Sequence, residues 1–171
     1  MSTDMSTYDK VFSDERYNLP DPQRLEFVRS WLKSKKVKDV VDIGCGRGNY
    51  LIPLSKEFNT TGVDPSAVTI KGLKAEQGDI LSYKGKHEAF YCMDVLEHLQ
   101  LHELVENIKA LSKIAPVGLL GIANHSDMWN GVELHTIQED SSWWSQALKG
   151  YFNVRLLQDG QRYFIFEVSR V

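Results

Sequence analysis

The sequence VVDIGCGRGN at residues 40–49 decides the fold. It begins inside a run rich in β-branched residues, 37–43, that is typical of a buried parallel strand, and apolar residues at helical spacing follow from Leu51. Glycines at such a junction let the backbone approach a ligand and leave helix N–H groups pointing at it. The stretch therefore predicts an α/β fold with a ligand at the turn between strand and helix.

The glycine spacing separates two classes of ligand. A dinucleotide-binding fold requires GxGxxG, but the sixth position here is Asn49, and Asp42 stands two residues before the first glycine. A carboxylate there repels a pyrophosphate and suits a cationic ligand, which disfavours a nicotinamide dehydrogenase. Asp64 ends the next predicted strand, where an acid can accept both hydroxyls of a ribose. A ligand with a ribose, a cation and no phosphates is S-adenosylmethionine.

Helical and strand-like patterns alternate along the rest of the chain. We expect helices to begin at Asp21-Pro22, Leu51, Gln100 and the capping box Thr136–Glu139, and strands to cover 37–43, 59–63, 76–81, 88–93, 117–123, 152–157 and 162–168. This alternation predicts an α/β fold, a three-layer α/β/α sandwich with a mostly parallel sheet. Residues 21–171 are expected to form a single domain. Residues 1–20, with Tyr8, Phe12 and Tyr17, are expected to form an N-terminal arm or lid.

Composition excludes several other classes of protein. The 171 residues are 42% hydrophobic and 25% charged, with a net charge of −3 and no basic stripe, so nucleic-acid binding has no electrostatic support. No apolar run reaches the roughly 18 residues of a membrane span, and no secretory signal precedes the domain. The two cysteines, Cys45 and Cys92, are isolated, which favours a reducing, cytoplasmic location.

Four ordered motifs resemble those of the class I, seven-stranded S-adenosylmethionine-dependent methyltransferases. They are VVDIGCGRGN, GVDPS at 62–66, GDIL at 78–81 and FYCMDVLEHL at 90–99, and the resemblance covers residues 37–171. It implies a sheet of order 3-2-1-4-5-7-6 with strand 7 antiparallel. It also implies S-adenosylmethionine as cofactor and S-adenosylhomocysteine as product.

The resemblance assigns roles to residues of the four motifs. The glycine loop would lie beneath the methionine part, Asp64 would bind the ribose, and Asp79 with the backbone at Ile80 would hold the adenine amine. Met93 and Asp94 would line the methyl side. The expected cofactor-binding set is Asp42, Gly44, Cys45, Gly46, Gly48, Asp64, Pro65, Asp79, Ile80, Met93 and Asp94.

Histidines and carboxylates follow the predicted fourth and fifth strands. His135, His125 and His98 are, in that order, the candidates for a catalytic base. Glu97, His98 and His135 are also compatible with a divalent metal. In small-RNA 2′-O-methyltransferases a similar Glu-x-x-Glu-His segment and a later histidine hold such an ion. Because Asp94 departs from the first position of that pattern, we expect a site without metal.

The sequence therefore predicts an enzyme that transfers a methyl group from S-adenosylmethionine to an oxygen or nitrogen of a small-molecule acceptor. The alternative is a non-catalytic, S-adenosylmethionine-binding partner subunit, since the chain is short and carries no sizeable substrate-recognition insert.

Overall fold

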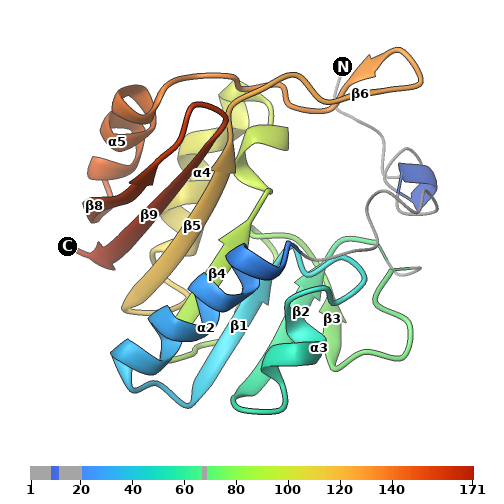
Figure 1. Ribbon diagram of the computed structural model, residues 1–171, viewed down its shortest axis with the longest axis vertical. Helices are drawn as coiled ribbons and strands as arrows, with labels where there is room; N and C mark the ends of the chain where they lie inside the picture. The colour runs from blue at the N-terminus through green and yellow to red at the C-terminus, as the bar shows by residue number, and fades with distance from the viewer. Residues whose placement is uncertain (1–8, 12–20, 67–68) are drawn as a thin grey trace.

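A seven-stranded sheet forms the centre of the computed structural model, which describes residues 9–11, 21–66 and 69–171 (Figure 1). Its strands are β1 (Asp39–Ile43), β2 (Asn59–Asp64), β3 (Ala75–Gln77), β4 (Ala89–Met93), β5 (Val117–Ala123), β8 (Phe152–Asp159) and β9 (Tyr163–Arg170). The strand order is β3-β2-β1-β4-β5-β9-β8, with β1 to β5 parallel and β9 antiparallel to both of its neighbours. The predicted order and the antiparallel last strand are confirmed.

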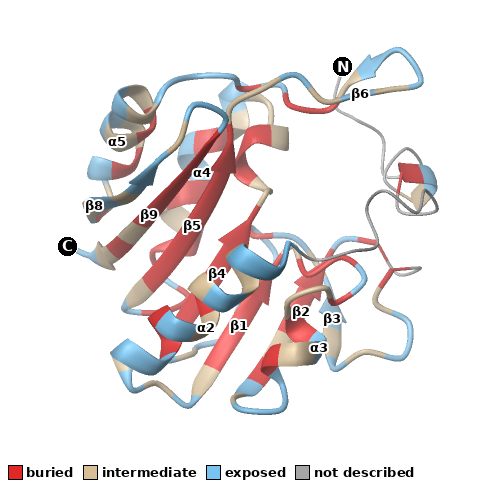
Figure 2. Cartoon of the chain, viewed as in Figure 1, coloured by how far each residue is buried: buried red, intermediate tan, exposed pale blue. Residues whose placement is uncertain are grey.

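Helices cover both faces of this sheet, which makes the predicted three layers. They are α2 (Pro22–Lys35), α3 (Leu51–Leu54), α4 (Leu101–Leu111) and α5 (Ser141–Lys149). One apolar cluster joins the sheet to α4 and α5, and a second joins its other face to α2 and α3. Successive strand residues serve opposite layers: Val40 packs in the second cluster and Val41 in the first. Figure 2 shows the central parallel strands buried between the helices.

Local signals set the start of α2. The Asp21 carboxylate accepts hydrogen bonds from the backbone N–H groups of Gln23 at 2.9 Å and Arg24 at 3.3 Å, as expected of an N-cap. The helix ends at Lys35, and its C-cap Lys36 adopts a left-handed conformation with φ 57°. The predicted cap at Asp21 therefore sets the position of Arg24 in the first turn of α2.

The capping box predicted at Thr136 is wrong. Helix α5 begins at Ser141, where the Asp140 carboxylate accepts a hydrogen bond from Trp143 N at 2.8 Å. The Thr136 hydroxyl instead donates to the backbone carbonyl of Glu97 at 3.3 Å, and also contacts that of Leu99. A tertiary contact therefore occupies the hydroxyl that the local pattern assigned to a helix cap.

The third strand is shorter and earlier than predicted, because β3 ends at Gln77. Asp79 and Ser82 form a turn instead, in which Ser82 N donates to Asp79 Oδ1 at 2.7 Å. Residues 69–74, between β2 and β3, are turns and bends rather than a helix.

A hairpin formed by β6 (Met128–Trp129) and β7 (Val132–Glu133) interrupts the connection from β5 to α5, and it projects from the body of the molecule (Figure 1). Its turn is Asn130-Gly131, both with positive φ. Of the predicted arm, residues 9–11 form one helical turn, while Tyr8, Phe12 and Tyr17 lie outside the described residues. In the described part of the chain, no helix combines the length and apolar character needed to cross a bilayer.

Candidate functional site

A cavity of about 720 Å³ opens where the parallel strands β1, β2, β4 and β5 end. Open α/β sheets bind their ligands at this edge. Most residues expected to bind the cofactor line it, namely Asp42, Gly44, Cys45, Gly46, Asp64, Pro65, Asp79, Met93 and Asp94. Gly48 and Ile80 are not among the lining residues, and Ile80 is buried with 4% exposure. The three predicted histidines, His98, His125 and His135, line the same cavity.

The glycine loop brings bare backbone to the cavity. Gly44 has φ 75°, and a Cβ atom built on it would lie 2.3 Å from Val95 Cγ2. The N–H groups of Gly44 and Cys45 both donate to the carbonyl of Val63, at 2.8 and 3.1 Å, which fastens the loop to β2. Any larger residue at Gly44 would therefore collide with the segment that follows β4.

Asp42 presents a buried acid at the start of this loop. Its side chain is 2% exposed, and its Oδ2 has no hydrogen-bond partner among the described residues. Burial raises the pKa of Asp42 well above its ordinary value, and nearby Asp64 raises it further. The unpartnered Oδ2 of Asp42 can accept a hydrogen bond from a ligand. A cationic amino group on that ligand would also stabilise the ionised form of this carboxyl, so the site fits such a ligand.

Asp64 is held by its own loop. Its Oδ2 accepts from Gly46 N at 2.9 Å, and its Oδ1 accepts from Ser66 N at 2.9 Å and from the Thr69 hydroxyl at 3.1 Å. Burial raises the pKa of Asp64 despite these hydrogen bonds. Two of the three bonds fill the lone pairs of Oδ1, so only Oδ2 can accept a further hydroxyl. The geometry therefore favours one ribose hydroxyl at this carboxylate, where the sequence predicted two.

The helical turn 9–11 lies at this end of the cavity. The Ser66 hydroxyl contacts the Asp9 carboxylate, and Val11, with 2% exposure, lines the cavity. Asp79 also lines it, although its Oδ1 caps the turn at Ser82. A turn-forming role and a ligand-binding role are both compatible with the two oxygens of this carboxylate.

Arg24 is a site residue that the sequence did not indicate. Its Nη1 lies 3.1 Å from Asp94 Oδ2, and its guanidinium carbon lies 3.5 Å from the centre of the Tyr163 ring. Asp94 itself has φ 56°, a left-handed conformation that few residues other than glycine adopt. Asp94 therefore lines the cavity from a left-handed backbone position, with Arg24 as its cationic neighbour.

The opposite end of the cavity holds the histidines. The ring centres of His98 and His135 are 4.7 Å apart, and those of His125 and His135 are 4.9 Å apart. His98 Nδ1 lies 2.9 Å from the Leu134 carbonyl, and His135 Nδ1 lies 2.7 Å from the His125 carbonyl. Because a carbonyl can only accept, each Nδ1 carries the hydrogen, and each neutral ring has its lone pair at Nε2. Burial, with His135 nearby, lowers the pKa of His98 to about 4.

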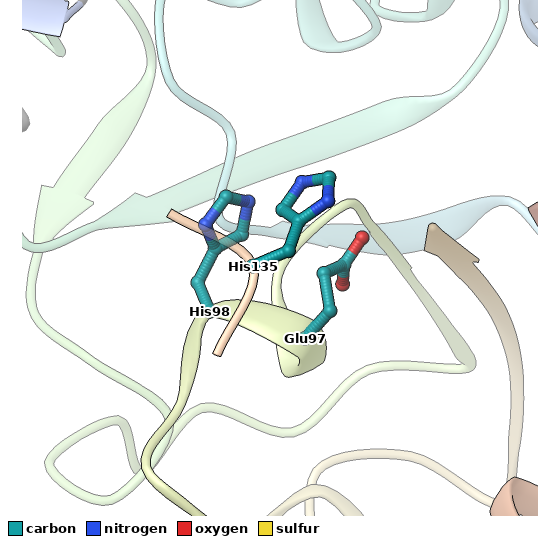
Figure 3. A group of neighbouring side chains, drawn as sticks. All are labelled: Glu97, His98 and His135. Carbon is teal, nitrogen blue, oxygen red and sulfur yellow. The ribbon is translucent and has the colours of Figure 1, made fainter. Parts of the chain in front are cut away.

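Glu97 lies behind these two rings and is 0% exposed. Its Oε1 accepts from Ala123 N at 2.7 Å, whereas its Oε2 has no hydrogen-bond partner within the described ranges. Burial raises the pKa of Glu97 well above its ordinary value, and Asp94 raises it further. In Figure 3, Glu97 and His98 rise from one turn (Leu96–His98), and His135 enters from a separate segment. Glu97, His98 and His135 together can accept a proton or hold a cation.

Two features of the site were not predicted from the sequence, for different reasons. Arg24 sits on an amphipathic helix with no sign of its distant partner, so nothing local marks it. The β6–β7 hairpin, whose ends lead to His125 and His135, had a usable signal in the dipeptide Asn130-Gly131.

Comparisons with known proteins identify the family and agree with the fold. A family model described as "Methyltransferase domain" matches residues 15–156, and no curated protein sequence matches significantly. Among solved structures, magnesium protoporphyrin IX methyltransferase from Synechocystis PCC 6803 with bound SAM is 21% identical, with TM-score 0.70, over 87% of this chain and 79% of that one. The methyltransferase domain of bacterial CtHen1 is 24% identical, with TM-score 0.67, over 86% and 97% of the two chains. An S-adenosylmethionine-dependent methyltransferase from Clostridium acetobutylicum ATCC 824 is 16% identical, with TM-score 0.73, over 96% of each chain.

Proposed function

The chain belongs to the family of methyltransferase domains, and from that premise we propose that it methylates an oxygen or nitrogen atom of a small-molecule acceptor. It is an S-adenosylmethionine-dependent methyltransferase, with S-adenosylhomocysteine as product. One observation carries the proposal on the acceptor: the cavity lined by Asp42 and Asp64, on β1 and β2, is also lined by His98, His125 and His135, which follow β4 and β5 farther along the sheet. Donor and acceptor therefore have separate ends of a single cavity.

At the donor end, the residues already described fit the cofactor. Asp42 Oδ2 would accept a hydrogen bond from its amino group, and Asp64 Oδ2 from one ribose hydroxyl. The bare backbone at Gly44 and Gly46 leaves room for its methionine part. When bound, S-adenosylmethionine supplies an electrophilic methyl group that needs little further activation, so the chain's main contribution is to position the acceptor.

At the acceptor end, His135 is the first candidate for the base. Its Nδ1–H is held by the His125 carbonyl, so its Nε2 lone pair can take the proton of an acceptor O–H or N–H. His125 is the second candidate and His98 the third, because burial that lowers the pKa of His98 to about 4 makes it a weak base.

The size and charge of the site favour a small acceptor. A cavity of about 720 Å³ is within the range of small-molecule sites, roughly 300–1,000 Å³, and it must hold the cofactor as well. The net charge of −3 gives no support to nucleic acid. We also propose a reducing, cytoplasmic location, because Cys45 and Cys92 are both free and buried thiols.

The test is incubation of the purified chain with methyl-labelled S-adenosylmethionine and fractions of a small-molecule extract. We expect label in a small-molecule product together with S-adenosylhomocysteine, and much less of both with Asp64→Ala at a cofactor concentration that does not saturate this variant. Tight S-adenosylhomocysteine binding without transfer to any fraction would overturn the proposal in favour of the non-catalytic subunit.

A further inference from the structure

We infer that Glu97, His98 and His135 form a binding site for one divalent transition-metal ion at the acceptor end of the cavity. Each of the three side chains offers one ligand atom, and these atoms all lie within 4.8 Å of one another (Figure 3). A hydrogen bond between Glu97 and His135 does not explain this convergence, because Glu97 Oε1 accepts from Ala123 N and His135 Nδ1 bonds to the His125 carbonyl. Atoms that share one central ion have this arrangement.

The orientation of the two imidazoles supports the site. His98 and His135 each donate Nδ1–H to a backbone carbonyl, at 2.9 and 2.7 Å. Metal-ligating histidines make this second contact almost always, because it fixes the ring and leaves Nε2 as the ligand atom. Both carbonyl groups, of Leu134 and His125, belong to the connection between β5 and α5.

The Glu97 side chain supplies an independent observation. It is 0% exposed, yet its Oε2 lacks a hydrogen-bond partner in the part of the chain that the structure describes. Leaving a buried carboxylate oxygen unsatisfied is costly. When Glu97 is ionised, its Oε2 and the Nε2 lone pairs of the two rings are all acceptors, and a cation can then bind all three at once.

Asp94 does not belong to the ligand set. Its carboxylate is occupied by Arg24, whose Nη1 lies 3.1 and 3.4 Å from its two oxygens. The site therefore has two nitrogen ligands and one oxygen ligand, which suits Zn²⁺ or Mn²⁺ better than Mg²⁺. The sequence pattern at Asp94 had led us to expect no metal, but the convergence of the other three residues does not involve Asp94.

The ion would connect two segments that form one wall of the cavity. Glu97 and His98 follow β4, whereas His135 follows the β6–β7 hairpin. His98 and His135 line the cavity while Glu97 lies behind them, so the position not filled by protein faces the cavity. There an acceptor oxygen or nitrogen can bind; this role rests on the proposed function, but the existence of the site does not.

The test is isothermal titration of the full chain, stripped of metal, with ZnCl₂, MnCl₂ and MgCl₂ in the absence of cofactor and acceptor. We expect one ion per chain and tighter binding of Zn²⁺ than of Mg²⁺. Glu97→Gln and His135→Ala should each weaken Zn²⁺ binding by more than about 100-fold, since even an outer-shell partner accounts for roughly 10–100-fold. His102→Ala, an exposed histidine on α4, should leave the affinity unchanged.

Glu97→Gln keeps an oxygen acceptor for Ala123 N, so a thermal midpoint close to that of the parent without metal will show that it folds. Absence of binding, or equal loss in the His102→Ala control, would overturn the site. Ion binding without methyl transfer would leave the site intact and count against the proposed function, so the two failures are distinguishable.

Discussion

Arg24 and Asp94 are 70 residues apart in the sequence and form an ion pair at the cavity, with Arg24 Nη1 3.1 Å from Asp94 Oδ2. The same guanidinium packs on the ring of Tyr163, the first residue of β9. One side chain of α2 therefore joins the end of β4 to the start of β9.

Replacing Arg24 tests this connection. Arg24→Ala should lower the free energy of unfolding by about 1–2 kcal/mol, less than the roughly 3–5 kcal/mol of a fully buried pair, because both side chains are partly exposed. Asp94→Asn in the same background should recover part of the loss by removing the unpaired charge. Urea denaturation measures both variants, and an unchanged loss in the double variant would exclude the ion pair as the cause.

Substitutions at two glycines distinguish the cost of backbone strain from the cost of a steric clash. Gly44 and Gly72 have φ 75° and 82°, but a Cβ atom at Gly44 meets Val95 whereas nothing lies within 4 Å of one at Gly72. Gly72→Ala should therefore cost only the strain, about 1–2 kcal/mol, and retain S-adenosylhomocysteine binding. Gly44→Ala should add about 1–3 kcal/mol of overpacking and abolish binding. Thermal denaturation and calorimetry will distinguish them; similar results for both would mean that the contact is unimportant.

Asp64 offers one remaining acceptor atom to a ribose. Asp64→Ala should weaken S-adenosylhomocysteine binding by about 1.5–3 kcal/mol, the value of one charged hydrogen bond, or roughly 10- to 150-fold. Isothermal titration at constant pH measures the change. Asp39→Ala, at the other end of the sheet, serves as control, and a loss below threefold for Asp64→Ala would remove this residue from the ribose site.

Metal removal separates two roles for His135. If the ion at Glu97, His98 and His135 holds the acceptor, a chelator should abolish methyl transfer and added Mn²⁺ or Zn²⁺ should restore it. His135→Ala should lower activity about 10²–10⁴-fold, as Glu97→Gln should too. Full activity in the chelator, combined with a loss in His135→Ala alone, would instead identify His135 as a base acting without metal.

Glu167 predicts a pH dependence of stability away from the cavity. Burial raises the pKa of Glu167, but hydrogen bonds from Lys35 and Trp31 outweigh it, so its pKa lies below the ordinary 4.5. A depressed pKa stabilises the fold above the unfolded-state value, and that stability is lost as pH falls through the folded-state value. Glu167→Gln should therefore cost about 0.5–1 kcal/mol at pH 7 and progressively less below about pH 4.5. Urea denaturation across this range, with exposed Glu139→Gln as control, measures it; a constant difference would exclude ionisation as the cause.

Local chemistry explains which parts of the fold were predictable. The cap at Asp21 and the glycine loop at 44–48 act within a few residues, so the sequence carries them. Thr136 had the same kind of local signal, but its hydroxyl bonds to the carbonyl of Glu97, 39 residues away, and the helix begins later. Short-range patterns predict an element only where no distant partner competes for the same atom.

The same distinction between local and long-range contacts applies to the candidate site. Asp42 and Asp64 lie near the carboxyl ends of neighbouring parallel strands, so topology alone places them together. The proximity of Arg24 to Asp94, and of Glu97 to His135, depends on side-chain packing between segments far apart in the chain. Their residue types were visible in the sequence, but their distances were not.

The β6–β7 hairpin is a place where the chain can change in length without disturbing the cavity. Its tip is exposed, with nothing within 4 Å of a Cβ atom built on Gly131, while its base is closed by a hydrogen bond from Asp127 N to Glu133 Oε1 at 2.8 Å. The strands that carry Asp42 and Asp64 take no part in it. Residues 128–133 are not among those that line the cavity, so a longer or chemically different tip can be introduced there while the residues around the cavity keep their places.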